Sequence, residues 1–310
     1  MSVAGGLHNA FDIAADAGCD CVQVFVKNQR QWAARRLTDE DLIAWRAAAL
    51  RTEIAPVVAH ATYLINLASP DDALWRRSID AYVIELERCA ALGIGGLVVH
   101  PGAHLGAGEV TGCRRVSDAL RLILDRTSDL QLAHLHGSNR SEGRSSNGRP
   151  TLPGTFGPPQ IWLEVTAGQG SCLGHRFEHL RDMIDVAGAD QRIGVCFDTC
   201  HALAAGYRFD TPERFAETFG AFDRILGLHR LGCFHLNDSQ REAGSRVDRH
   251  THVGRGHVGR AAFRLIVNDA RFRSLPMILE TPKGEDPRGR DYDRLNLAAL
   301  RRMLARPKAR

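Results

Sequence analysis

Six short apolar runs of this chain each end in a side chain that can bind a metal ion. Apolar runs of this length are typical of the buried strands of a parallel sheet. A carboxylate or imidazole at the end of such a strand needs a partner, because burying it alone is costly in free energy. Repetition of the pattern predicts one shared metal site, formed by His60, His100, Glu164, Asp198, His235 and Glu280.

Three further residues extend this set. His201 follows Asp198 by three residues, and Asp248 and His250 stand two residues apart, so an extended loop would direct both to one side. The resulting nine nitrogen and oxygen ligands are too many for one tetrahedral ion and suit two or three. The imidazole-rich set favours zinc, or manganese or iron, over magnesium or calcium. Clustered divalent ions suit phosphoester hydrolysis, because they stabilise both the attacking and the leaving oxygen.

The cysteines and the other histidines carry no comparable pattern. Eight cysteines form no C-x-x-C pair, and Cys196 and Cys233 lie inside apolar runs, where small core residues are expected. Histidines away from the strand ends are expected to be surface or structural residues: His104, His134, His136, His175, His179, His229, His252 and His257.

Strands and helices alternate along the chain, which indicates parallel strands joined by crossover helices. Seven strands are expected, over residues 21–27, 55–61, 96–102, 161–168, 194–201, 232–238 and 277–282. Helices are expected over 5–18, 38–52, 71–92, 116–127, 177–187, 212–222, 260–269 and 291–306, with a long polar loop over 239–259. This α/β pattern favours a TIM (β/α)8 barrel, in which all strand ends converge on one face, over an open doubly wound sheet.

The expected barrel is one strand short. Its first strand should precede the first helix, where only Met1, Ser2 and Val3 stand, so this strand is predicted to be truncated. A true start upstream is favoured over a barrel open along one seam, because an open seam exposes strand edges. Residues 1–310 are expected to form a single domain with a disordered, functionally neutral insertion at 137–159, rich in Gly, Ser, Pro and Arg.

Composition is ordinary for a soluble globular protein, with 44% hydrophobic and 25% charged residues. The chain has neither an apolar run of about 18 residues nor a secretory signal, so a cytoplasmic protein without a membrane partner is expected. The net charge of +4 is compatible with a nucleic-acid partner but does not by itself indicate one.

Eight segments carry long and specific motifs: KNQRQW (27–32), HATYLINLASP (60–70), HPGAHLG (100–106), EVTAGQGSCLG (164–174), GVCFDTCHALAAGY (194–207), FHLNDS (234–239), GSRVDRHTHVGRG (244–256) and LET (279–281). Together they resemble the endonuclease IV family of zinc-dependent apurinic/apyrimidinic (AP) endonucleases. The resemblance runs in order from residue 3 to about residue 305 and is interrupted only by the insertion.

The resemblance implies a trinuclear zinc centre. The first zinc ion would be held by His60, His100 and Glu164, the second by Glu164, Asp198, His235 and Glu280, and the third by His201, Asp248 and His250. The implied reaction is hydrolysis of the phosphodiester bond 5′ to an abasic site, leaving a 3′-hydroxyl and a 5′-deoxyribose phosphate, in base excision repair. Glu164, Asp198 and Glu280 would be the catalytic carboxylates, and no protein general base would be needed.

The resemblance also implies DNA contacts. Arg30, Tyr63 and Leu64 match the positions with which family members wedge into the base stack and flip the abasic nucleotide out. The implied partner is double-stranded DNA with abasic sites or 3′-blocked ends, and the implied protein is a monomer associated with the nucleoid. Val165 stands where the family usually carries Asn, which would loosen the setting of Glu164.

Two other interpretations stay open. A sugar isomerase or epimerase of the same barrel fold would hold two metals, mostly through carboxylates, and would not cleave DNA. A non-catalytic DNA-binding relic would have a barrel that cannot close and would bind DNA without turnover. The imidazole-rich ligand set argues against the first alternative, and nine intact ligands argue against the second.

Overall fold

A computed structural model of the chain describes residues 1, 3–133 and 158–305. Almost all of the insertion predicted at 137–159 therefore lies outside the described residues. The described chain on either side of it contacts the N-terminal end of the sheet region. The backbone N–H of Ala133 donates to Ala90 O, and that of Gln160 donates to Gly95 O, just before the third strand begins.

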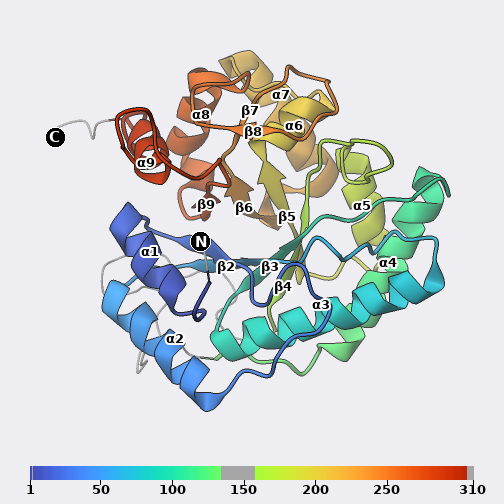
Figure 1. Ribbon diagram of the computed structural model, residues 1–310. Helices are drawn as coiled ribbons and strands as arrows, with labels where there is room; N and C mark the ends of the chain where they lie inside the picture. Colours follow the sequence, from blue (N-terminus) through green and yellow to red (C-terminus); the bar gives the residue numbers. More distant parts are fainter. Residues whose placement is uncertain (2, 134–157, 306–310) are drawn as a thin grey trace.

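Seven parallel strands form one sheet in sequence order, and helices surround it (Figure 1). The strands are β1 (Val22–Val24), β2 (Val57–His60), β3 (Gly96–Val99), β4 (Gln160–Glu164), β5 (Ile193–Asp198), β6 (Leu231–His235) and β9 (Met277–Ile278). This arrangement confirms the predicted TIM barrel. Among the described strands none precedes β1, and the Met1 amino group donates to Gln23 O at 2.6 Å. The barrel is nearly closed, with a seam between β1 and β9.

Several helix ends are fixed by side-chain or glycine caps. Thr38 and Asp41 form a capping box, Thr211 caps the helix that starts at Pro212, and Gly93 ends another at φ 67°. The helices are α1 (Asn9–Ala17), α2 (Asp39–Thr52), α3 (Asp72–Leu92), α4 (Glu109–Arg126), α5 (Phe177–Val186), α6 (Thr199–Ala205), α7 (Pro212–Leu226), α8 (Gly259–Asn268) and α9 (Tyr292–Arg301).

Several predicted boundaries are wrong by a few residues: the first helix begins at Asn9, α7 ends at Leu226 and α9 ends at Arg301. Three further differences have a clear structural reason. Helix α4 begins at Glu109 and not at 116, because Gly108 precedes it without a side-chain cap and leaves no start signal. The segment 194–201 is not a strand to its end: the Asp198 carboxylate accepts the His201 N–H, which caps α6. The loop predicted over 239–259 contains a short antiparallel pair, β7 (Asp238–Ser239) and β8 (His250–Thr251).

One layer of side chains fills the barrel beneath the strand ends. Its buried members are Val58, Val98, Trp162, Cys196, Cys233 and Ile278, with Cys21 packed against them. Trp162 is the largest of these, and three glycines make room for it. A Cβ atom added to Gly96, Gly194 or Gly232 would lie 2.4, 2.8 or 2.3 Å from the indole ring. The indole ring therefore fills the space that these three glycines leave inside the barrel.

Candidate metal centre

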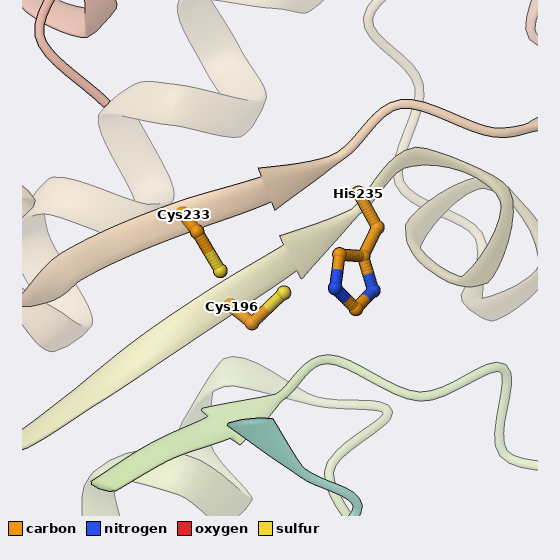
Figure 2. Close-up of side chains that lie close together, drawn as sticks. All are labelled: Cys196, Cys233 and His235. Carbon is orange, nitrogen blue, oxygen red and sulfur yellow. The ribbon is translucent and has the colours of Figure 1, made fainter. Parts of the chain in front are cut away.

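Each of the six buried members of this interior layer lies two residues before one predicted strand-end ligand. Side chains alternate along a strand, so the residue two positions later points to the same side, into the barrel. Figure 2 shows this for β5 and β6, where the sulfur atoms of Cys196 and Cys233 are turned toward each other on the side of the His235 ring. The layer supports six strand-end side chains: His60, His100, Glu164, Asp198, His235 and Glu280.

Glu164 lies at the middle of this group and is fully buried. Four imidazole nitrogens lie 3.1 Å from its carboxylate oxygens: Nε2 of His60, Nε2 of His100, Nδ1 of His201 and Nδ1 of His235. Burial alone would raise the pKa of Glu164, but the surrounding imidazoles, His235 foremost, hold it well below its usual range. The carboxylate is therefore ionised and faces several nitrogen atoms at once.

The other three carboxylates join the same group. Glu280 Oε2 lies 3.2 Å from His235 Nδ1, and Asp198 Oδ2 lies 3.9 Å from the same atom. On the other side, Asp248 Oδ1 lies 3.2 Å from His201 Nε2 and 3.4 Å from His250 Nε2. All nine residues singled out in the sequence are thus brought together at the C-terminal ends of the strands.

Backbone carbonyls orient three of the imidazoles. His60 Nδ1 donates to Ala61 O at 2.7 Å, His201 Nδ1 to Val165 O at 3.1 Å, and His250 Nδ1 to Glu280 O at 3.3 Å. A carbonyl oxygen only accepts, so each Nδ1 carries the hydrogen and each Nε2 presents a lone pair. These lone pairs face carboxylate oxygens. The arrangement fits divalent cations such as zinc, because a cation between facing acceptors removes their repulsion.

The pKa values of two imidazoles also indicate an excess of negative charge at the centre. Burial opposes the charged form of His201 and His235, yet the neighbouring carboxylates, Asp198 for His201 and Glu280 for His235, raise both imidazole pKa values well above the usual range. Protons on these imidazoles thus offset part of the negative charge of the carboxylates, and bound metal ions would offset it fully.

Three supporting residues were missed in the sequence: two are amides, which are not typical metal ligands, and one is an aspartate that follows a strand end by three residues and hydrogen-bonds to backbone N–H groups. Asn237 Nδ2 donates to Asp198 Oδ2 at 2.6 Å, and Asn237 Oδ1 accepts the Glu280 N–H at 2.7 Å. Asp238 accepts the N–H groups of Gly254, Gly256 and Val258, and so shapes the loop that carries Asp248 and His250. The third, Gln23, lies 2.9 Å from His235 Nε2 through its Oε1.

The predicted DNA-contact residues lie on the loops after β1 and β2, on the face of the candidate centre. Arg30 is exposed, Tyr63 is 64% exposed and Leu64 is half-buried. The Tyr63 ring lies 5.7 Å from that of His60 and 6.5 Å from that of His100, and it lines a pocket with both. An exposed aromatic side chain therefore stands at the rim of the candidate metal centre.

Val165 contributes to the centre through its backbone. Its carbonyl accepts from His201, while its side chain is buried in the apolar core. Cys196 and Cys233 are core residues, as predicted, and burial raises the pKa of the Cys196 thiol well above its usual range. A neutral thiol is a poor metal ligand, so the interior layer is a support for the centre and not part of it.

A second cluster lies at the starts of α4 and α5 and consists of Glu109, His175 and His179. The Gly174 N–H donates to His179 Nδ1 at 3.4 Å, so His179 Nε2 carries the hydrogen and donates to Glu109 at 3.3 Å. Burial lowers the pKa of both histidines. Hydrogen bonding thus accounts for His179, in line with the structural role expected of these histidines; His134 and His136 lie outside the described residues.

Comparison with known proteins identifies the family. A family model described as a xylose isomerase-like TIM barrel matches residues 11–303. A curated protein of Chloroflexus aggregans named "Probable endonuclease 4" is 47% identical over 304 residues, covering 98% of this chain and 96% of that protein. The chain belongs to the endonuclease IV family. A Geobacter sulfurreducens protein of the same name is 43% identical over 306 residues, covering 99% of this chain and 93% of that protein.

Solved structures agree with this membership. Endonuclease IV from Thermus thermophilus matches with a TM-score of 0.75 at 33% identity, covering 98% of this chain and 96% of that one. Membership of the endonuclease IV family makes the chain a nuclease, and therefore a hydrolase. A D-tagatose 3-epimerase-like protein matches with a TM-score of 0.65 at 16% identity, which shows the fold alone. No helix within the described residues is long and apolar enough to cross a membrane.

Proposed function

We propose that this endonuclease IV family member is a DNA repair enzyme that cuts the phosphodiester bond 5′ to an abasic site, leaving a 3′-hydroxyl and a 5′-deoxyribose phosphate. The observation that carries the proposal is the convergence of nine nitrogen and oxygen ligands beside the exposed Tyr63. The relatives named endonuclease 4 support the same activity.

The proposed cofactor is a set of three zinc ions, with manganese or iron as substitutes at individual positions. Glu164 would serve the first two ions, and each ion would have its own further ligands: His60 and His100; Asp198, His235 and Glu280; and His201, Asp248 and His250. When bound, such ions lower the pKa of water toward about 7 and stabilise charge on a phosphate.

The side chains of the chain have two tasks in this proposal. The carboxylates Glu164, Asp198 and Glu280 hold the centre together, and none is free to act as a general base, because each already contacts imidazoles. Arg30, Tyr63 and Leu64 bind the DNA and occupy the space of the extruded nucleotide. The substrate is double-stranded DNA, which a monomer would bind in the cytoplasm at the nucleoid.

The test is incubation of the zinc-loaded protein with a duplex that contains one abasic site, with products resolved by size and end chemistry. A single cut 5′ to the site with a 3′-hydroxyl end is expected. Glu280→Ala should abolish cutting and leave DNA binding nearly intact, because it removes a ligand and not a DNA contact. Glu217→Ala, an exposed glutamate on α7, is the matched control and should cut normally. A zinc-loaded protein that leaves abasic DNA intact would contradict the proposal.

A further inference from the structure

The ring of strand-end side chains has a seventh member, which is an amide. Gln23 lies in β1, two residues after Cys21, just as the other six each lie two residues after a member of the interior layer. Its side chain is 8% exposed. Every strand of the seven-stranded sheet therefore contributes one side chain to the ring, and β1 contributes Gln23.

The Gln23 amide contacts two candidate ligands from distant parts of the chain. Its Nε2 donates to Glu280 Oε1 at 2.6 Å, and its Oε1 lies 2.9 Å from His235 Nε2. A carboxylate accepts hydrogen bonds, so the amide nitrogen must face Glu280 and the amide oxygen must face His235. Since the amide oxygen only accepts, the hydrogen of His235 is placed on Nε2.

This assignment leaves the lone pair of His235 on Nδ1. That atom lies 3.1 Å from Glu164 Oε1 and 3.2 Å from Glu280 Oε2, on the side where the carboxylates gather. Backbone carbonyls orient the other three rings described above, whereas His235 is oriented by a side chain. The orientation of this ring is therefore open to change by substitution.

We propose that Gln23 is a positioning residue for the metal centre, which holds His235 in the tautomer that ligates through Nδ1 and fixes the Glu280 carboxylate. The inference rests on the proposed function, because it concerns the same centre. Groups that hydrogen-bond to metal ligands typically change metal affinity by about 10–100-fold when they are removed. Substitution of Gln23 should therefore weaken the binding of only one ion, the one that His235 and Glu280 would hold.

A purely structural role must be separated from this one, because Gln23 also bridges the seam between β1 and β9. Cys21 provides the matched control. Its Sγ contacts Met277 O at 3.7 Å across the same seam, and within the described residues no hydrogen bond joins it to a candidate ligand. Gln23→Met keeps the length of the side chain and removes both hydrogen bonds, whereas Cys21→Ala removes the Sγ contact across the seam and leaves both hydrogen bonds of Gln23 in place.

The first measurement is zinc affinity, by competition with a chromophoric chelator and without DNA. Gln23→Met is expected to weaken one zinc equivalent by about 10–100-fold, and Cys21→Ala to leave all equivalents as in the unmodified protein. Unchanged zinc affinity in Gln23→Met would overturn the inference, as would an equal loss in Cys21→Ala. Because no DNA is present, failure of the proposed nuclease function would show separately, as normal zinc binding without incision.

The second measurement is the tautomer of His235, from nitrogen NMR of histidine-labelled, zinc-loaded protein, in which one ring nitrogen binds the ion and the other carries the hydrogen. The unmodified protein should show hydrogen on Nε2, and Gln23→Met should lose this preference. Gln23→Glu retains an acceptor toward His235 but repels Glu280, so it should retain the tautomer. Retention of the Nε2–H form in Gln23→Met, or its loss in Gln23→Glu, would overturn the inference.

Discussion

The Nε2 atoms of His201 and His250 face each other at 3.4 Å, although the Nδ1 atom of each ring already donates to a backbone carbonyl. Two lone pairs therefore point at one another, and Asp248 Oδ1 lies 3.2 and 3.4 Å from the same two atoms. Three acceptors with no hydrogen between them are stable together only around a cation or an added proton.

His250→Ala should remove one zinc equivalent and leave the other two, because His250 is a proposed ligand of the third ion alone. Incision should fall by at least about 100-fold, since an ion that stabilises a leaving oxygen supplies several kcal/mol. Zinc content by atomic absorption and incision of abasic duplex check this. His257→Ala, an exposed histidine on the same loop, should keep full zinc and activity. Normal zinc content in His250→Ala would contradict the assignment.

Tyr63→Ala and Arg30→Ala should weaken binding of abasic DNA and leave zinc content unchanged. Both side chains are exposed, and Tyr63 lies beside His60 and His100. Neither is one of the nine proposed ligands. Loss of one stacking contact is worth about 1–3 kcal/mol, or roughly 5- to 150-fold in Kd. Fluorescence anisotropy with abasic and intact duplexes measures the effect. Arg224→Ala, on the outer helix α7, is the charge-matched control, and equal weakening there would show a non-specific effect.

Gly232→Ala should destabilise the fold, because the added Cβ would lie 2.3 Å from the Trp162 ring. Overpacking of this kind costs about 1–3 kcal/mol in free energy of unfolding. Gly220→Ala is the opposite case: it lies within α7, and an added Cβ meets nothing within 4 Å. It should stabilise the fold by about 0.5–1 kcal/mol. Urea unfolding of both variants gives the comparison, and a destabilised Gly220→Ala would contradict the argument.

Glu85, on α3, should make stability fall as pH rises toward neutrality. Burial raises the pKa of Glu85 to about 7 from the usual 4.5, against the attraction of Lys27 at 3.7 Å. The folded state then keeps a proton that the unfolded chain releases above about pH 4.5. The free energy of unfolding therefore decreases between about pH 4.5 and 7, by up to about 3 kcal/mol. Glu85→Gln should flatten this decrease in urea unfolding at pH 5, 6 and 8; parallel pH profiles would refute it.

Much of the centre could be predicted because it depends on local signals. A strand in a TIM barrel delivers its last inward side chain to one face, so His100 or Glu164 can be placed from its apolar run alone. Gln23 and Asn237 could not be found in this way, because their roles depend on partners far along the chain, 257 residues away for Gln23 and Glu280. The regular two-residue spacing after Cys21 is the signal that would have found Gln23.

Helix boundaries were predicted wrongly where one residue belongs to two elements, or where no side chain marks the boundary. Asp198 ends β5 and also caps α6, so the strand pattern concealed the helix start. Gly108 precedes α4 with no side chain to cap it, so nothing in the sequence marked the start. Boundaries are therefore easiest to predict from the sequence where each terminal residue belongs to one helix or one strand only.

Trp162 and its three facing glycines impose a constraint on how this chain can change over evolutionary time. A larger residue at Gly96 or Gly232 is admissible only after the indole has been replaced, and loss of the indole leaves a void that those two positions can fill. At Gly194 an added Cβ would also lie 2.8 Å from the backbone oxygen of Arg230, so a glycine is required there whatever stands at 162. Positions 96, 162 and 232 should therefore covary among relatives, with a tryptophan accompanied by glycines and smaller residues at 162 accompanied by bulkier neighbours. Changes in this part of the barrel should accumulate in concert and not one at a time.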